Sequence, residues 1–277
     1  MRFSFAGADS EQLADDIEAA ASRDLYQAAP PAAGARFTSI GGATALIAPT
    51  LPVTYFNRVI GLGSGAPATA ADIDDIIAEY AASNVRNYWI HVGPSAQPPT
   101  LATQLTQRGF ATGTRRSWAK FLRGVEPSSA RDTELTLREA TAADANAVAT
   151  VVCTAYGLPP ELTPWFAALV GRPRWRVWLA ERDDYVVATG SLFVDGDTAW
   201  LGVAATLAQH RGLGAQSALL AARIHAAAEM GCRVIATETG EPTGNEPSPS
   251  LANIRRAGFA QMSSRLNYAS PQSAPKR

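Results

Sequence analysis

The sequence TAWLGVAATLAQHRGLGAQSALL, residues 198–220, decides the fold of this chain. Its first part, Thr198–Thr206, is apolar and partly β-branched, which predicts a buried strand. Gly212 and Gly214 then allow a tight turn close to a ligand, because neither residue carries a Cβ. The Ala- and Leu-rich run 215–230 has apolar residues at helical spacing and predicts a helix.

This order of strand, glycine turn and helix predicts an anion site. A helix that begins in a glycine turn presents unpaired N–H groups and the positive end of its dipole. Arg211 adds a positive charge at the same place. A phosphate loop of the ATPase type is disfavoured, since residues 215–217 read Ala-Gln-Ser and contain no Lys. A dinucleotide-binding turn stays a weaker alternative: Ser217 replaces its third glycine, although Glu238 stands near its acidic position.

A protein family matches this turn better. The segment 206–215 resembles the acetyl-CoA loop of the GNAT superfamily of N-acetyltransferases, which reads Arg/Gln-x-x-Gly-x-Gly/Ala. Arg211 and Gly214 match, whereas Gln216 stands where the family has Gly or Ala and Ala208 stands where Pro is common. The resemblance covers the chain from Leu135 to its end. It continues through a strand at 233–237 and a helix that ends in Arg-Arg-Ala-Gly-Phe at 255–259.

The resemblance implies acetyl-CoA as co-substrate. The pyrophosphate would lie on the N–H groups of 211–216. The pantetheine arm and the thioester carbonyl would meet backbone groups near Thr206 and Leu207, where the strand separates from its neighbour. Asn253 and Ser250, on the last helix, are placed to hydrogen-bond the same molecule. The expected acetyl-CoA-binding residues are Thr206, Leu207, Arg211, Gly212, Leu213, Gly214, Ala215, Gln216 and Asn253.

The catalytic groups are harder to assign. The family often uses a Tyr of the last helix as general acid, and counting back from Gly258-Phe259 places Ile254 at that position. Glu238 follows an apolar strand at the end where this fold would open its site, so it is the candidate general base; a solvated acid at a strand end is the alternative. His210 is expected at the surface. Three aromatic residues lie where the family covers its acceptor, although packing in the core is the commoner role of such residues: Tyr156, Trp165 and Trp175.

The first half of the chain repeats the order of the second. It has a helix at 11–24 with Ser10 as N-cap, a hairpin 36–40/44–48, a strand 57–62, a helix 71–83, a strand 88–92, a helix 99–108 and a strand 118–122. Gly109-Phe110 corresponds to Gly258-Phe259. We therefore expect two copies of one fold. The first copy's loop, 61–67, lacks the Arg, so its acetyl-CoA site is expected to be lost.

These observations predict an α+β fold with two GNAT-like domains, each a mixed, mostly antiparallel sheet flanked by helices. The expected boundaries are a degenerate domain at 1–125, a linker at 126–133 and an acetyltransferase domain at 134–277. In the second domain, strands 177–181, 186–194 and 198–206 would be antiparallel, with the hairpin turn at Asp195-Gly196. Thr141 or Asp144 caps the helix that runs to Tyr156. The tail 270–277 is expected to be disordered.

Composition restricts the function further. The net charge is -1 without a long basic run, which disfavours nucleic-acid binding. The 2 cysteines, Cys153 and Cys232, have no metal-like spacing, and no apolar run would span a membrane. We expect a cytoplasmic monomer or homodimer without a metal. It would move an acetyl group from acetyl-CoA directly to an amine of a small molecule or peptide. The alternative is a non-catalytic acyl-CoA-binding or regulatory protein of the same fold.

Overall fold

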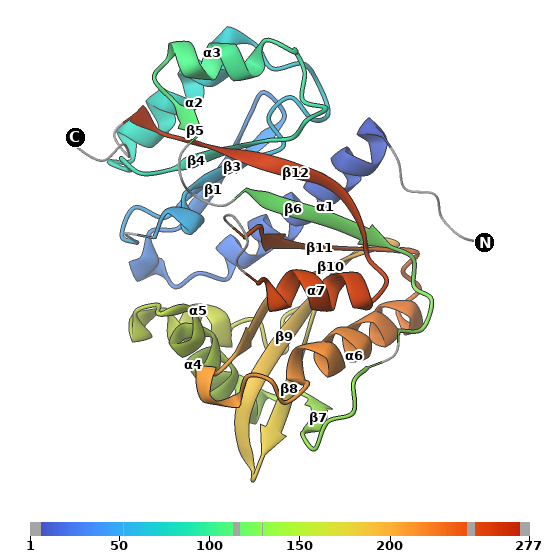
Figure 1. Cartoon of the computed structure of the whole chain (residues 1–277). Coiled ribbons are helices and arrows are strands. Elements are labelled where there is room, and N and C mark those ends of the chain that lie inside the picture. Colours follow the sequence, from blue (N-terminus) through green and yellow to red (C-terminus); the bar gives the residue numbers. More distant parts are fainter. Residues whose placement is uncertain (1–6, 52, 113–116, 129, 243–246, 272–277) are drawn as a thin grey trace. The chain divides into compact units, whose positions relative to one another are not determined.

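The computed structural model describes residues 7–51, 53–112, 117–128, 130–242 and 247–271 (Figure 1). Its contacts divide the chain into two compact units. The C-unit contains Phe121–Glu238 and Ser248–Gln261. The N-unit contains Phe5–Lys120, Thr239–Pro247 and Met262–Arg277, so residues from the last part of the sequence belong to the same unit as most of its first half. The proposed boundaries at 125 and 134 stay a prediction about the two sequence copies.

The C-unit is built on a mixed sheet with strand order β11-β10-β9-β8-β7. Its members are β7 (Thr136–Glu139), β8 (Trp175–Arg182), β9 (Tyr185–Asp195), β10 (Thr198–Thr206) and β11 (Val234–Gly240). Only β10 and β11 run parallel; the other neighbours are antiparallel. The expected hairpin turn at Asp195-Gly196 is present, with Gly196 at φ +60°. This sheet confirms the mixed, mostly antiparallel class.

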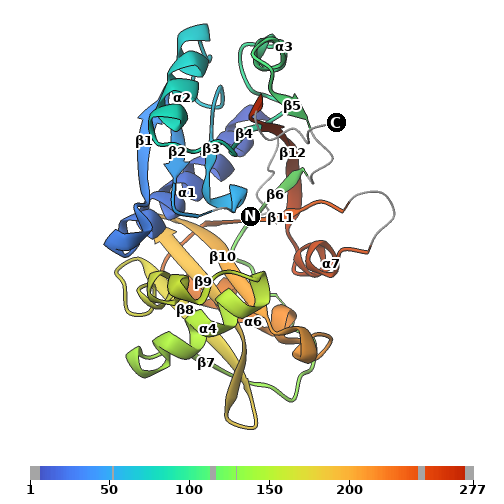
Figure 2. The ribbon, with the colours of Figure 1, turned by 90° about the vertical axis from the view of Figure 1, so that its left-hand side faces the viewer.

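Helices cover both faces of the C-unit sheet. They are α4 (Ala145–Tyr156), α5 (Thr163–Ala167), α6 (Ala215–Glu229) and α7 (Pro249–Arg256). Helices α4 and α5 lie on one face and α6 on the other, so α4 and α5 stand in front of the strands in Figure 2. Thr141 and Asp144 form a reciprocal capping box at the 3₁₀ turn Ala142–Asp144, which leads into α4.

The N-unit sheet has the order β1-β2-β3-β4-β12. Its members are β1 (Arg36–Ile40), β2 (Ala43–Ile47), β3 (Arg58–Ile60), β4 (Trp89–Val92) and β12 (Ala260–Ala269); β5 (Ala111–Thr112) pairs with β12. Here too one pair, β3 with β4, is parallel and the others are antiparallel. Strand β6 (Trp118–Arg123) leads from the N-unit into the C-unit.

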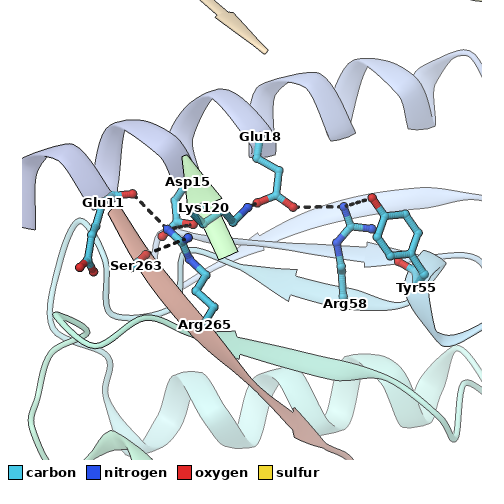
Figure 3. A network of polar contacts seen from close by, with 8 residues as sticks. All are labelled: Glu11, Asp15, Glu18, Tyr55, Arg58, Lys120, Ser263 and Arg265. Atoms are coloured by element: carbon cyan, nitrogen blue, oxygen red, sulfur yellow. Dashed lines mark hydrogen bonds and ion pairs between the residues drawn. The ribbon is translucent and has the colours of Figure 1, made fainter. Parts of the chain in front are cut away.

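The two faces of the N-unit sheet differ in chemistry. Helices α2 (Ala70–Ala82) and α3 (Leu101–Gln107) pack on one face over an apolar core that includes Ile73, Tyr80 and Leu105. Helix α1 (Ala8–Gln27) lies on the other face, where buried charged side chains meet (Figure 3). The expected N-cap at Ser10 is wrong: α1 begins after Gly7, and Glu11 N–H donates to the Gly7 carbonyl, so Ser10 lies within the helix.

The two units repeat one topology. Strands β1, β2, β3 and β4 correspond to β8, β9, β10 and β11, with two antiparallel pairs followed by one parallel pair. A glycine turn and a helix, α2 or α6, follow the third strand in each case. The internal repeat inferred from element order is therefore confirmed. Besides the turn at Ala142–Asp144, the described residues form four short 3₁₀ turns: Pro31–Ala33, Thr54–Phe56, Pro160–Leu162 and Ala208–His210.

Two features are absent from the described residues. No helix there is long and apolar enough to cross a membrane. Among the same residues, no group of three or more His, Cys, Asp or Glu side chains is arranged to hold a metal ion. Most of the tail for which disorder was expected, 272–277, lies outside the described residues.

Candidate acetyl-CoA site

The first turn of α6 is an uncapped helix start. Gly214 is its N-cap residue, at φ +85° and ψ -5°, and provides no side-chain cap. Gly212 has the same φ of +85°, which L side chains rarely adopt. None of the described residues accepts a hydrogen bond from the N–H groups of 212–217. Arg211 is exposed beside them. Several amide donors and a cation thus converge where an anion is expected.

The corresponding turn in the N-unit is closed by the protein itself. Thr69 and Asp72 form a capping box at the start of α2, which satisfies amide donors and adds a carboxylate. The Gln97 carbonyl accepts from Ala68 N–H at 2.8 Å, and Gln97 N–H donates to the Gly63 carbonyl at 2.8 Å. A Cβ at Gly63 would overlap the Gln97 carbonyl. This loop therefore lacks the free donors of the α6 turn. That agrees with the expectation that the first copy has no acetyl-CoA site.

Strand β10 continues beyond the point where its pairing with the parallel strand β11 ends. Pairing with β11 covers Thr198–Leu201 against Val234–Thr237 and ends there, although β10 continues to Thr206. At the last pair, the Thr237 hydroxyl donates to the Leu201 carbonyl at 2.8 Å. On its other edge β10 stays attached to β9, and Leu207 N–H donates to the Val187 carbonyl at 3.0 Å. The edge of β10 that faces β11 is thus separated from residue 202 onward.

Gln216 joins the loop to the last helix. Its Nε2 donates to the Ser250 hydroxyl at 3.0 Å, and its Oε1 accepts from Asn253 Nδ2 at 2.5 Å. Both partners lie on α7. Gln216, which stands where the family has Gly or Ala, therefore has a structural role: its side-chain amide holds α7 beside the α6 turn. Asn253 and Ser250, expected to face acetyl-CoA, are held next to the turn by this link.

The segment that precedes β7 supports the loop from another side. The Thr133 hydroxyl donates to the Leu213 carbonyl at 2.6 Å, and Arg131 N–H donates to the Ser217 hydroxyl at 3.0 Å. A Cβ added to Gly214 would lie 3.2 Å from Thr133 Cβ and 3.3 Å from the Asp132 carbonyl oxygen. Gly214 is therefore required by packing against this segment as well as by its backbone conformation.

The catalytic candidates lie at different depths. Glu238 directly follows Thr237, the last residue of β11 paired with β10, and is half-buried. Ile254, at the family's tyrosine position, is only 3% exposed. His210 is half-buried, with Nδ1 shielded from solvent and without a partner among the described residues, so the expected surface position is only partly right. Glu238 is thus the carboxylate at the point where the two strands separate.

The three aromatic candidates divide clearly. Trp165 and Trp175 are buried core residues. Tyr156, the last residue of α4, is 57% exposed, and its hydroxyl donates to the Ala204 carbonyl of β10 at 2.6 Å.

Sequence reasoning missed a bulge in β10 near this contact, and the buried Arg223 on α6. Gly190 and Gly202 inside predicted strands were the available signal, because a strand glycine often marks a bulge or close approach.

The comparisons with known proteins agree with this architecture. Residues 146–259 match the model of the family described as the acetyltransferase (GNAT) family. A search of curated proteins gave no match. Among solved structures, a GCN5-related N-acetyltransferase from Kribbella flavida has a TM-score of 0.63 at 18% identity, over 93% of this chain and 95% of that one. A GCN5-related N-acetyltransferase from Sphaerobacter thermophilus has a TM-score of 0.61 at 16% identity, over 82% and 80%.

A third similar structure covers both copies. It is a tandem GNAT protein from the clavulanic acid biosynthesis pathway, with a TM-score of 0.61 at 17% identity over 100% of this chain and 99% of that one. At these identities the structures establish the fold. The uncapped start of α6, the separation of β10 from β11 and the family match over residues 146–259 together define a GNAT domain. Residues 146–259 thus match the GNAT acetyltransferase family, and the whole chain has the fold of a tandem GNAT protein.

Proposed function

We propose that this protein is an acyl-CoA-dependent N-acyltransferase that moves an acetyl group from acetyl-CoA directly to an amine of a small molecule or peptide. The observation that carries the proposal is the contrast between the two glycine turns. The α6 turn keeps its amide donors free beside Arg211, whereas Gln97 and Asp72 occupy the donors of the α2 turn. Only the first arrangement suits a pyrophosphate.

The residues of the C-unit suit each part of acetyl-CoA. Amide groups of 212–217 and the Arg211 guanidinium would hold the pyrophosphate, because both favour a dianion at a helix start. Backbone groups of the separated edge of β10, up to Thr206, would hold the pantetheine arm. The Leu207 N–H and carbonyl are bonded to Val187 and His210, so Leu207 would contact the arm through its side chain. Bound acetyl-CoA supplies an activated thioester. N–H groups on that edge would stabilise negative charge that develops on its carbonyl oxygen.

Glu238 is the proposed base for the acceptor amine. Its place directly after the last paired residue of β11 puts a carboxylate at the start of the strand separation. A carboxylate there would take the ammonium proton directly or through a water molecule. Ile254 has no proton to donate. The thiolate would then leave without general acid from α7, which its modest basicity, a pKa of about 8.5, permits.

The second candidate is an acyl-CoA-binding protein without turnover. It is favoured by one observation, the buried Ile254 in place of the family's tyrosine. Both candidates require the same acetyl-CoA site. They differ in whether the thiol of CoA is released when an amine is present. We further propose that the acceptor is a small amine and that the protein acts as a monomer or homodimer.

Titration calorimetry of the full chain with acetyl-CoA, with NADH and ATP as controls, tests the site. Binding of acetyl-CoA alone supports the proposal, whereas binding of NADH alone supports a dinucleotide site. Thiol release with a panel of amines then separates the two candidates. Glu238→Gln is expected to slow turnover about 100-fold or more without weakening acetyl-CoA binding, as for loss of a general base. Equal rates would remove Glu238 from the mechanism.

A further inference from the structure

Strand β10 contains a strained bulge just after its pairing with β11 ends. Gly202 pairs with Ser191 and Ala205 with Thr189, so Val203 and Ala204 together oppose the single residue Gly190. Val203 has φ +45°, a left-handed conformation that is unusual for a β-branched residue. Such a conformation is strained and persists only where the surroundings hold it.

One support comes from the α4 face of the sheet. The Tyr156 hydroxyl donates to the carbonyl of Ala204, inside the bulge, at 2.6 Å. Tyr156 is 57% exposed as a residue, but desolvation of its hydroxyl raises its pKa, and the hydroxyl is a donor at neutral pH. The last turn of α4 is itself fixed, since Gly157 is left-handed and Leu158 N–H donates to the Cys153 carbonyl at 2.8 Å.

The second support comes from the α6 face. Arg223 is 2% exposed, and its guanidinium donates to the carbonyls of Ser191 at 3.1 Å and Leu219 at 2.9 Å. It fills the place above Gly190, where an added Cβ would lie 2.7 Å from Arg223 Cζ. Burial lowers its pKa to about 10, so it remains charged at neutral pH. No carboxylate within the described part of the chain forms an ion pair with it.

We propose that Tyr156 and Arg223 form a clamp that holds the β10 bulge in the conformation that binds the pantetheine arm of acetyl-CoA. The inference rests on the proposed function. Tyr156 holds β10 directly at Ala204, and Arg223 holds the paired strand β9 at Ser191, the residue opposite Gly202; both contacts lie next to the edge of β10 that β11 leaves unpaired. Tyr156 and Arg223 are positioning residues here, because Tyr156 acts through the backbone of β10 and Arg223 through the backbone of β9, which pairs with the bulge. The pyrophosphate site at the α6 turn does not depend on them.

The test compares two probes on the full chain by calorimetry. Acetyl-CoA carries the pantetheine arm, and adenosine 3′,5′-bisphosphate lacks it. Tyr156→Phe removes one hydrogen bond of about 1 kcal/mol and is expected to weaken acetyl-CoA binding about 5- to 10-fold. Binding of the bisphosphate is expected to change less than about two-fold. Tyr185→Phe is the matched control, since Tyr185 is 75% exposed, and it should alter neither affinity.

Gly190→Ala tests the other half of the clamp. Its Cβ would displace the Arg223 guanidinium, and the same selective loss of acetyl-CoA affinity is expected. Equal weakening of both probes by Tyr156→Phe, or no weakening of either, would overturn the clamp while leaving the proposed function intact. Failure of the unmodified chain to bind acetyl-CoA would overturn the proposed function and the clamp together. Thermal melting of Tyr156→Phe provides the check on folding.

Discussion

The guanidinium of Arg265, on the last strand, lies 2.5 Å from the carboxylate of Asp15 on the first helix (Figure 3). Arg265 also donates to the backbone carbonyl of Glu11 at 3.1 Å. One turn further along α1, Glu18 pairs with Arg58 at 3.2 Å and with Lys120. Because buried charges are stable only when they are paired, these carboxylates of α1 need their partners on β3, β6 and β12, and the pairs fix α1 against those strands.

Arg265→Met is expected to destabilise the protein by about 3–5 kcal/mol, since it leaves the buried Asp15 carboxylate without its cation. Urea unfolding of the full chain measures this. The matched control is Arg233→Met, which breaks an exposed pair with Asp197 and should cost about 0–1 kcal/mol. The double variant Asp15→Leu/Arg265→Met should lose less than the sum of its single changes. Equal effects of the Arg265 and Arg233 variants would contradict the role of the pair in fixing α1.

A single acetyl-CoA should bind per chain, because Gln97 and the Thr69–Asp72 capping box occupy the turn of the first copy. Arg211→Ala is expected to weaken binding about 10-fold, the loss of one charge-assisted contact of about 1.5 kcal/mol. Calorimetry at two salt concentrations measures both quantities. Arg233→Ala is the control for overall charge. A second molecule bound per chain would show that the first turn is also a working site.

Gly214→Ala should destabilise the protein more than Gly212→Ala. Both residues have φ +85°, so each change costs about 1–2 kcal/mol of backbone strain. Only at Gly214 does the new Cβ also press on Asp132 and Thr133, at 3.3 and 3.2 Å, whereas the space at Gly212 is open. Urea midpoints measure the difference. A larger effect at Gly212 would mean that the 131–133 segment does not constrain the loop.

Removal of the Asp144 carboxylate should reduce stability in a pH-dependent way. Asp144 accepts from Arg138 and from Thr141 N–H, and these bonds hold its pKa well below its usual range. A lowered pKa in the folded state stabilises the protein above the unfolded pKa of about 3.9, and this contribution disappears as the pH falls further. Asp144→Ala should therefore cost about 1–2 kcal/mol at pH 7.

The difference between Asp144→Ala and the unmodified protein should shrink below about pH 4. Unfolding by urea at several pH values measures it. Asp75→Ala, at an exposed position on α2, is the control and should stay within about 0.5 kcal/mol throughout. A difference that stays constant into strong acid would rule out the carboxylate as the source of the stabilisation.

Several elements followed from local sequence with good accuracy. The predicted strand at 198–206 coincides with β10, and the helix expected at 215–230 is α6, Ala215–Glu229. Apolar periodicity and glycine placement are local properties, so they are readable without the fold. The resemblance at Arg211 and Gly214 likewise placed the acetyl-CoA loop at an uncapped helix start. The assignment of individual residues to acetyl-CoA stays a prediction.

What the sequence could not show depends on residues that are distant along the chain. The last strand was not predicted, and nothing local to 260–269 indicates that it pairs with β4 rather than within its own copy. Gln216 gave no sign that its amide would tie α7 to the loop. Isolated glycines at 190 and 202 hinted at a bulge, but its two supports, Tyr156 and Arg223, lie on separate helices.

The sequence by itself determined the class of this protein: two copies of an α+β unit, with a glycine turn and a helix start at Arg211–Gln216 in the second. These features arise from short-range conformational preferences, which act between near neighbours. Only the tertiary structure decided that the first turn is closed by Gln97, that β12 completes the N-unit and that the β10 bulge is held from two faces. Those outcomes follow from the pairing of buried polar groups, and a group's partner is known only once the chain is folded.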